Sequence, residues 1–365
     1  MSANSYDKYK RPKHSCNKPL TGDNWCKHCN SKHFEKEFGT WTSDNNHVDE
    51  LIQKTQTEAN DHNKVLEWIR FKSKEIFCVG FLAEGGNGHV YKAKWKSGPI
   101  EYYDEEVKGW HRSGEIDIVL KSIKDSKDIT DEFFEEIKQQ MTSFRQFSYI
   151  IRCYGITKIP DSDNYMMIMD YKKDGSLRKY LDKNFRLLKW RQKLNILYTA
   201  IKGLLDIHKA DLMHKDFHSG NIIISDNFSY IADFGLCKSV NSNAQSHPPY
   251  HTIPHDQYLM IDIAKGRRPV PNEDITPPAI INLIERCWNE NPNDRPDANE
   301  LFKTFSSFMQ KESEIQTKFD AIDAKMNSNI SSPEFSPSLT YTISKDSIYT
   351  SRHLILPELS IPFDY

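Results

Sequence analysis

A short polar stretch in the second half of the chain combines residue types that can move a proton and bind metal ions. Asn221 comes five residues after Asp216, and Asp233 comes twelve residues after Asn221. An aspartate can accept the proton of an incoming hydroxyl. An asparagine can ligate one Mg²⁺, and a second aspartate the Mg²⁺ that bridges the β- and γ-phosphates of a nucleotide. We therefore take Asp216 as a candidate base and Asn221 and Asp233 as candidate metal ligands.

Two short apolar runs are expected to bring these side chains together. The runs 222–224 and 230–232 flank Asp226-Asn227, a pair typical of turns. A hairpin of the two runs would place Asn221 beside Asp233. Chance would rarely produce His-x-Asp-x-x-x-x-Asn followed by Asp-Phe-Gly at this spacing.

A second candidate group lies upstream. The glycine-rich stretch 82–90 lies between two predicted strands, and a turn with few side chains lets backbone N–H groups close over phosphates. Glycine-rich hairpins are common, so this signal is weak by itself. Lys121 lies in an apolar run and needs an acidic partner if it is buried, for which Glu136 on the next predicted helix is suited. The alternative is that both are surface residues.

The apolar periodicity predicts strands first and helices afterwards. Predicted strands cover 77–82, 89–95, 116–123 and 165–169. Predicted helices cover 129–147, 177–181, 191–211, 278–288 and 298–308. This order predicts an α+β fold with two lobes. An insertion that includes residues 95–115 is expected to extend a surface loop.

The composition restricts the partners. Lys plus Arg number 49 and Asp plus Glu 51, a net charge of −2, which gives no electrostatic case for nucleic acid. No run reaches the roughly 18 apolar residues of a membrane span, and the polar N-terminus lacks a secretory signal. We therefore expect no membrane partner and, by default, a cytoplasmic location.

A cysteine cluster near the N-terminus has metal-ligand spacing. Cys26 and Cys29 form a Cys-x-x-Cys pair, and Cys16 would supply a third thiolate to a tetrahedral Zn²⁺ site. His14 or His33 would be the fourth ligand. A second Cys-x-x-Cys pair is missing, so zinc and unliganded surface thiols remain as alternatives.

On these motifs, and on Arg286-Cys287-Trp288 with Asp294-Arg295-Pro296, residues 73–308 resemble eukaryotic protein kinases. The sequence looks closest to the tyrosine-kinase-like group, of the kind expanded in some symbiotic fungi. The resemblance implies a bilobal protein-kinase-like fold, ATP and Mg²⁺ as cofactors, and transfer of the γ-phosphate to a protein hydroxyl in signal transduction. The resemblance does not identify the protein substrate or signalling partner.

The resemblance also implies a role for each candidate residue. Asp216 would be the catalytic base, and the Lys121–Glu136 pair would hold the α- and β-phosphates. Met169 would be the gatekeeper, with residues 170–172 as the hinge that reads adenine through backbone groups. The implied nucleotide- and metal-binding set is Ala83, Gly85, Gly88, Val90, Lys121, Met169, Asp170, Lys172, Asn221 and Asp233.

The chain departs from the family pattern in several places. Ala83 stands at the first glycine position. Lys215 replaces the arginine usual before the base and would clamp a phosphorylated activation loop less well. His218 stands where serine/threonine kinases commonly carry lysine, which leaves the preferred hydroxyl open.

The largest departure follows the Asp-Phe-Gly motif. Only 62 positions separate Asp233 from Arg295, and no Ala-Pro-Glu occurs. By this comparison about 40 family residues are absent, which carry the activation segment and the central helix of the helical lobe. We expect that lobe to be compromised or rearranged, with exposed apolar surface. The alternative function is therefore a nucleotide-binding pseudokinase or scaffold. A splice form or a faulty gene model would produce the same gap.

The predicted organisation has four parts. Residues 1–45 form a cysteine-containing, candidate zinc-binding segment, and residues 46–72 a helical linker. Residues 73–308 form the kinase-like domain, with lobes at 73–169 and 172–308. Residues 309–365 are expected to be a disordered tail rich in Ser, Thr and Pro.

Overall fold

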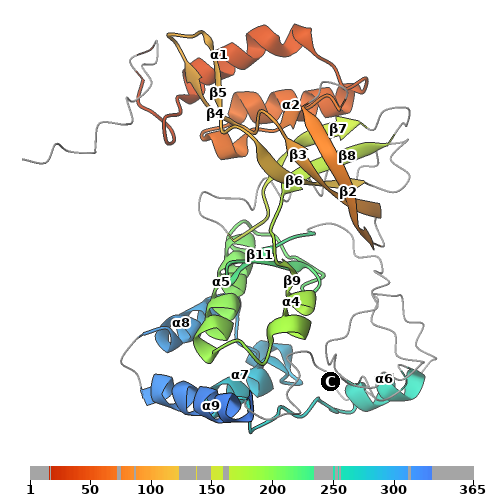
Figure 1. The fold of residues 1–365 in the computed structure, drawn as a ribbon, viewed down its shortest axis with the longest axis vertical. Helices are drawn as coiled ribbons and strands as arrows, with labels where there is room; N and C mark the ends of the chain where they lie inside the picture. Colours follow the sequence, from red (N-terminus) through yellow and green to blue (C-terminus); the bar gives the residue numbers. More distant parts are fainter. Residues whose placement is uncertain are drawn as a thin grey trace, which may run out of the picture. The chain divides into compact units, whose positions relative to one another are not determined.

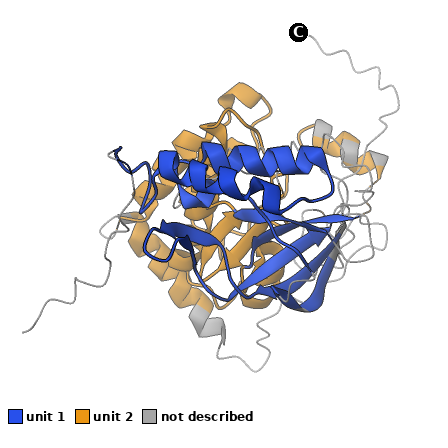
Figure 2. Cartoon of the chain, turned by 90° about the horizontal axis from the view of Figure 1, so that it is seen from above, with its two compact units in different colours: residues 1–147, 151–171 blue, residues 148–150, 172–365 orange. Residues whose placement is uncertain are grey.

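The computed structural model describes residues 16, 18–71, 75–85, 88–122, 137, 149–158, 164–233, 250, 254, 256–310 and 314–330. The chain divides into two compact units, one of residues 1–147 and 151–171 and one of residues 148–150 and 172–365 (Figure 2). The first unit is rich in strands and the second in helices. The predicted α+β kinase-like fold, with a strand-rich and a helical lobe, is confirmed.

The first unit is built on a six-stranded sheet with the order β1-β7-β8-β6-β3-β2 (Figure 1). Its strands are β1 (Glu67–Trp68), β2 (Ile76–Gly85), β3 (Gly88–Trp95), β6 (Ile116–Ser122), β7 (Cys153–Lys158) and β8 (Tyr165–Asp170). All neighbours pair antiparallel except β1, which runs parallel to β7. The four strands predicted from the sequence are confirmed.

One face of this sheet carries a hydrophobic core. Buried residues alternate along the strands, as at Ile118 and Leu120 in β6 and at Met166 and Ile168 in β8. Because side chains in a strand alternate between faces, these residues lie on one side of the sheet. Residues such as Lys121 and Met167 therefore face the other side.

The N-terminal segment belongs to the same unit. It forms α1 (Lys27–Glu37), η1 (Phe38–Thr40), α2 (Asn46–Glu58) and η2 (His62–Lys64) before entering the sheet as β1. The Asn45 side chain caps α2 by accepting hydrogen bonds from the backbone N–H groups of residues 47 and 48. On the first turns of α2, Val48 and Ile52 are fully buried. The Tyr165 hydroxyl of β8 donates to the Ser43 carbonyl at 2.9 Å, so this segment packs directly against the sheet unit.

The insertion does not form the expected surface loop. It folds into an antiparallel hairpin of β4 (Ile100–Asp104) and β5 (Gly109–Arg112). The Trp110 ring stacks on Phe34 of α1 at 4.2 Å between centroids and on Trp25 at 6.0 Å. Trp25 and Phe34 are buried at this contact. The hairpin forms because its aromatic side chains cover the apolar face of the N-terminal segment.

The second unit is organised around the long helix α5 (Trp190–His208). One side of α5 packs against α7 (Pro278–Cys287), α8 (Ala298–Phe308) and α9 (Glu314–Ile330). Another side packs against α4 (Leu177–Asn184) and strand β10 (Ile222–Ser225). The other elements are β9 (Gly175–Ser176), β11 (Phe228–Ile231), α6 (Gln257–Ala264) and η3 (Pro292–Asp294). The helices predicted in this unit are confirmed.

Two predicted segments need separate comment. Of the helix predicted over 129–147, only Ile137 lies within the described residues, where it is helical and fully buried. Residues 314–330, expected to be disordered, form α9 instead. Phe319 is fully buried and stacks on Trp190 at 5.7 Å. Residues 315, 319, 322 and 326 repeat at helical spacing, a signal that the Ser- and Pro-rich composition further along obscured. Within the part of the chain that is described, no helix is long and apolar enough to cross a membrane.

Candidate active site

A tight hairpin positions the metal-ligand candidates of the second unit. Strands β10 and β11 pair antiparallel, with Ile222 opposite Ile231. The turn residues Asp226 and Asn227 both have positive φ, 54° and 63°, which matches the two-residue hairpin turn favoured by the twist of the strands. Asn221 directly precedes β10, and Asp233 follows β11 by two residues. The predicted hairpin is confirmed, and the Ala232 N–H donates to the Asn221 carbonyl at 2.9 Å.

The side chains of Asn221 and Asp216 are in direct contact. Asn221 Nδ2 donates to Asp216 Oδ2 at 3.0 Å and to the Asp216 carbonyl at 3.1 Å. Both acceptors are oxygens, so the amide nitrogen must face Asp216 and the amide oxygen must point to the other side. Asn221 is buried, which holds this orientation. The Asn221 amide oxygen therefore points away from the candidate base. Oxygen is the ligand atom that a hard cation such as Mg²⁺ prefers.

His214 connects the loop of the candidate base to the segment before Asp233. Its Nε2 donates to the Ala232 carbonyl at 2.9 Å, so its Nδ1 is the acceptor of the Asp216 N–H at 3.3 Å. Burial lowers the pKa of His214, and the neutral ring suits both contacts. No role for His214 was predicted from the sequence. Its position two residues before Asp216 is the local signal that could have indicated one.

Two residues beside these groups have an unusual backbone conformation. Lys215 has φ 63° and Asp233 has φ 59°. The left-handed region is uncommon for residues other than glycine, although aspartate enters it more readily than lysine. Such residues gather at functional sites, where the surrounding contacts hold them in place. Here the hydrogen bonds of His214 and Asn221 hold Asp216 and Ala232, the residues next to these two positions.

The candidate phosphate-binding residues of the first unit share one face of the sheet. Ala83 pairs with Val90, Val90 with Lys121, and Lys121 with Met167. Direct cross-strand partners point to the same side, so this row lies opposite the core face of the sheet. Gly85 and Gly88 pair at the tip of the β2–β3 hairpin. Lys121 is only 7% exposed.

The predicted gatekeeper and hinge residues lie at the end of β8. Met169 is buried and pairs with Val119 of β6, and Asp170 donates its N–H to the Arg152 carbonyl at 2.9 Å. Lys172 begins the second unit, where its ammonium lies 3.9 Å from the centre of the Tyr230 ring. Residues 170–172 therefore lie at one of the points where the chain passes from one unit to the other.

The structure does not describe every candidate. Glu136, residues 86–87 and Phe234-Gly235 lie outside the described residues. Lys121 and Met169 belong to the first unit, whereas Asp216, Asn221 and Asp233 belong to the second. Each group is therefore described within its own unit.

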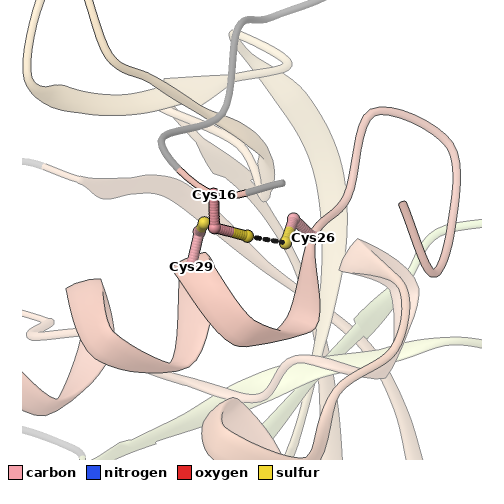
Figure 3. Close-up of side chains that lie close together, drawn as sticks. All are labelled: Cys16, Cys26 and Cys29. Atoms are coloured by element: carbon pink, nitrogen blue, oxygen red, sulfur yellow. Dashed lines mark hydrogen bonds between the residues drawn. The ribbon is translucent and has the colours of Figure 1, made fainter. Parts of the chain in front are cut away.

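The N-terminal cysteines form a compact group. The sulfur atoms of Cys16, Cys26 and Cys29 lie within 4.8 Å of one another, and Figure 3 shows the three side chains turned toward a common point. Cys26 and Cys29 are buried at the start of α1. A hydrogen bond from the Lys18 backbone lowers the pKa of Cys16, while burial raises the pKa of Cys26.

His33, one of the two candidate histidines, contacts other residues than these cysteines. His33 stacks on Tyr103 at 3.5 Å between centroids and lies 3.4 Å from the Glu105 carboxylate. It is held by the insertion hairpin rather than by the cysteines. His14 lies outside the described residues.

Comparison with known proteins gives consistent matches. A probable serine/threonine-protein kinase of Dictyostelium discoideum is 24% identical over 306 residues, covering 69% of this chain and 13% of that protein. Serine/threonine-protein kinase 4 homolog B of the same organism is 23% identical over 292 residues, covering 68% of this chain and 24% of that protein. Tyrosine-protein kinase receptor svh-2 of Caenorhabditis elegans is 24% identical over 184 residues, covering 50% of this chain and 15% of that protein. The chain spans less than a quarter of the length of these relatives.

The sequence profile of protein tyrosine and serine/threonine kinases matches residues 78–254. That range contains the glycine-rich hairpin, the buried lysine of β6, and the β10–β11 hairpin with its flanking Asn221 and Asp233. The strand-rich unit followed by a helical unit agrees with the same family. Residues 78–254 therefore resemble a protein kinase domain.

Proposed function

We propose that this protein is an ATP-dependent protein kinase that transfers the γ-phosphate of ATP to a protein hydroxyl. The observation that carries the proposal is the contact of Asn221 Nδ2 with the Asp216 carboxylate at 3.0 Å, in a loop bonded through His214 to the segment that ends in Asp233. A general base must be held in one orientation, and this network of hydrogen bonds holds the Asp216 carboxylate.

The residues fit Mg·ATP by the chemistry of their donor atoms. The amide oxygen of Asn221 and the carboxylate of Asp233 are the oxygen ligands that Mg²⁺ prefers. Bound Mg²⁺ would neutralise the charge of the β- and γ-phosphates. Asp216 would accept the proton of the attacking hydroxyl, and Lys121, partnered by Glu136, would hold the α- and β-phosphates. The backbone of Ala83, Gly85 and Gly88 would cover the phosphates, with Val90, Met169, Asp170 and Lys172 around the adenine.

We further propose that the chain is a tyrosine-kinase-like relative whose helical unit lacks the activation segment and central helix. Two observations support the loss of these two elements. Met213 and Phe217, which flank Asp216, are 69% and 41% exposed, as expected if a covering helix is absent. The Arg295 guanidinium donates to the carbonyls of residues 289 and 290, and no carboxylate of the described residues pairs with it. Sequencing the transcript across residues 238–248 would reveal a skipped exon.

The kinase proposal is tested by phosphate transfer from radiolabelled Mg·ATP to pooled peptides that contain Ser, Thr or Tyr. The wild-type chain should transfer phosphate, and Asp216→Asn should lose about 10²- to 10⁴-fold in kcat, the typical contribution of a general base. Asp211→Asn is the matched control, because Asp211 is an exposed aspartate outside the network. Phosphoamino-acid analysis of the product would identify the preferred hydroxyl.

The pseudokinase alternative gives a different pattern. It predicts nucleotide binding that Lys121→Ala weakens, with no transfer by the wild-type chain. Transfer that is equal in Asp216→Asn and the wild type would point to a contaminating kinase, and the proposal would then be wrong.

We also propose that the N-terminal cysteines bind one Zn²⁺, with His14 as the fourth ligand. Zn–S bonds of about 2.3 Å in a tetrahedral site place two sulfurs about 3.8 Å apart. The Cys16 and Cys26 sulfurs are 3.6 Å apart, which is close to that spacing and well beyond a disulfide bond of about 2.05 Å.

Elemental analysis of the purified chain tests this site. We expect close to one zinc per wild-type chain and a loss of at least about tenfold in zinc affinity for Cys16→Ser and Cys29→Ser. Cys287→Ser is the control, since Cys287 lies in α7 of the other unit. A metal-free chain whose mass is two hydrogens below that of the fully reduced chain would contain a disulfide instead of a zinc site. That result would contradict the proposal.

A further inference from the structure

His218 has a tautomer that its own hydrogen bonds determine. Its Nδ1 accepts the Gly220 N–H at 2.9 Å. A ring nitrogen that accepts a hydrogen bond carries no proton, so in the neutral ring the proton lies on Nε2. That Nε2 lies 3.2 Å from Asp216 Oδ2. The protonated nitrogen of the neutral ring therefore lies next to the carboxylate of the candidate base.

Two nitrogen atoms thus lie close to one oxygen of Asp216. Asn221 Nδ2 donates to Oδ2 at 3.0 Å, and His218 Nε2 lies 3.2 Å from the same atom. The two nitrogens come from opposite ends of a four-residue segment, so together they fix the rotation of the carboxylate about its Cβ–Cγ bond. The Asp216 side chain is only 20% exposed, which limits competition from water and strengthens both interactions.

The residues after His218 are suited to this arrangement. A Cβ on Gly220 would lie 2.6 Å from Cε1 and 2.8 Å from Nδ1 of the His218 ring. No real side chain tolerates such contacts, so glycine is needed for the ring to lie here. Ser219 anchors the segment to α4, because its carbonyl accepts the Arg178 N–H at 3.0 Å.

We propose that His218 is a positioning residue for Asp216, and this inference rests on the proposed kinase function. One ring both accepts from the loop backbone and donates to the carboxylate. A lysine at this position could only donate, because an ammonium group has no acceptor. In this chain the orientation of the base is therefore set by an imidazole held in a single tautomer.

The test compares two amides at position 218. Glutamine places an N–H near the position of histidine Nε2 and can still donate to Asp216. Asparagine is one methylene shorter and reaches only the Nδ1 position, next to the Gly220 N–H. We expect His218→Asn to lower kcat about tenfold, because this variant loses the interaction with the charged Asp216 carboxylate. His218→Gln keeps that interaction, so its kcat should stay within about threefold of wild type. KM for ATP should be unchanged in both variants. Equal kcat values for the two variants would overturn the inference.

Nitrogen NMR of the histidine rings tests the geometry without activity. The wild-type chain should show His218 as the neutral Nε2–H tautomer, and Gly220→Ala should remove that single state. Gly39→Ala is the control, since a Cβ there meets no atom within 4 Å. A predominant Nδ1–H tautomer in the wild type would overturn the inference even if the kinase is active. A wild-type chain with the expected tautomer but no phosphate transfer would instead contradict the proposed function, and with it the catalytic role of His218.

Discussion

Lys193 shows how a single buried charge affects the second unit. It lies on α5 and is 5% exposed, with its ammonium 4.1 Å from the centre of the Phe185 ring and 5.0 Å from that of Trp190. Aromatic faces attract a cation, but they replace only part of the lost hydration. Burial lowers the pKa of Lys193 to about 8. The folded unit therefore carries an unfavourable charge at neutral pH.

We predict that Lys193→Met stabilises the protein at pH 7. In the unfolded chain lysine titrates near 10.4. Between about pH 8 and 10.4 only the unfolded chain keeps the proton, so the stability of the wild type rises with pH across that window. The methionine variant has no buried charge at this position and therefore lacks its energetic cost. Its free energy of unfolding should exceed wild type by on the order of 2 kcal/mol at pH 7, and the gain should shrink toward pH 10.

Urea unfolding at pH 7, 8.5 and 10 measures this difference. Lys209→Met is the control, because Lys209 is exposed just after α5, and it should show no such pH dependence. A gain from Lys193→Met that is the same at pH 7 and pH 10 would contradict the charge argument.

Among the elements, α9 depends most clearly on contacts far along the chain. Phe319 stacks on Trp190 at the start of α5. The Asp323 carboxylate accepts the Trp190 N–H at 2.9 and 3.1 Å to its two oxygens, so α9 supplies the anionic cap that the N-terminus of α5 lacks in its own sequence. Each helix thereby stabilises the other.

We predict that Phe319→Ala costs about 3 kcal/mol of unfolding free energy, as for other large-to-small changes at fully buried aromatic sites. Hydrogen exchange should also accelerate in α9 and in the first turn of α5. Lys318→Ala on the exposed side of α9 should change stability by less than about 0.5 kcal/mol. Equal stability of the two variants would mean that α9 does not dock in solution.

At the scale of the whole molecule, the first unit includes residues that precede the region matched by the kinase profile. The match begins at residue 78, yet β1 pairs with β7 through Glu67–Gly155 and Trp68–Ile156. A Cβ on Gly155 would lie 2.1 Å from the Glu67 carbonyl oxygen. Glycine at this position of β7 therefore allows β1 to pair with it. The Arg112 guanidinium pairs with the Glu67 carboxylate, which joins the insertion hairpin to the same strand.

We predict that a chain shortened to residues 73–365 loses thermal stability in its first unit and tends to aggregate, because β7 becomes an open edge. Differential scanning calorimetry and light scattering would measure both effects. Gly155→Ala in the full chain should lower the first unit's transition temperature as well, whereas Gly39→Ala should not. A shortened chain as stable as the full one would show that residues 16–71 are dispensable for folding.

Local patterns account for what could be predicted from the sequence. Strand alternation, helical periodicity and the Asp226-Asn227 turn are written within a few neighbouring residues. For the same reason the candidate base and metal ligands could be named in advance, since Asp216 and Asn221 are only five positions apart. Backbone geometry at such short range leaves few arrangements, and the chemistry of the side chains follows from their types.

By itself, then, the sequence determined the strand-then-helix plan, the kinase resemblance and the identity of the candidate catalytic groups. Only the tertiary structure decided the docking of α9, the packing of the insertion hairpin on α1, and the tautomers of His214 and His218. Those features depend on contacts such as Phe319 with Trp190 and Trp110 with Phe34, which join residues far apart in the chain. No local pattern encodes such contacts, because the partner of each side chain is selected by burial and shape once the whole unit has folded.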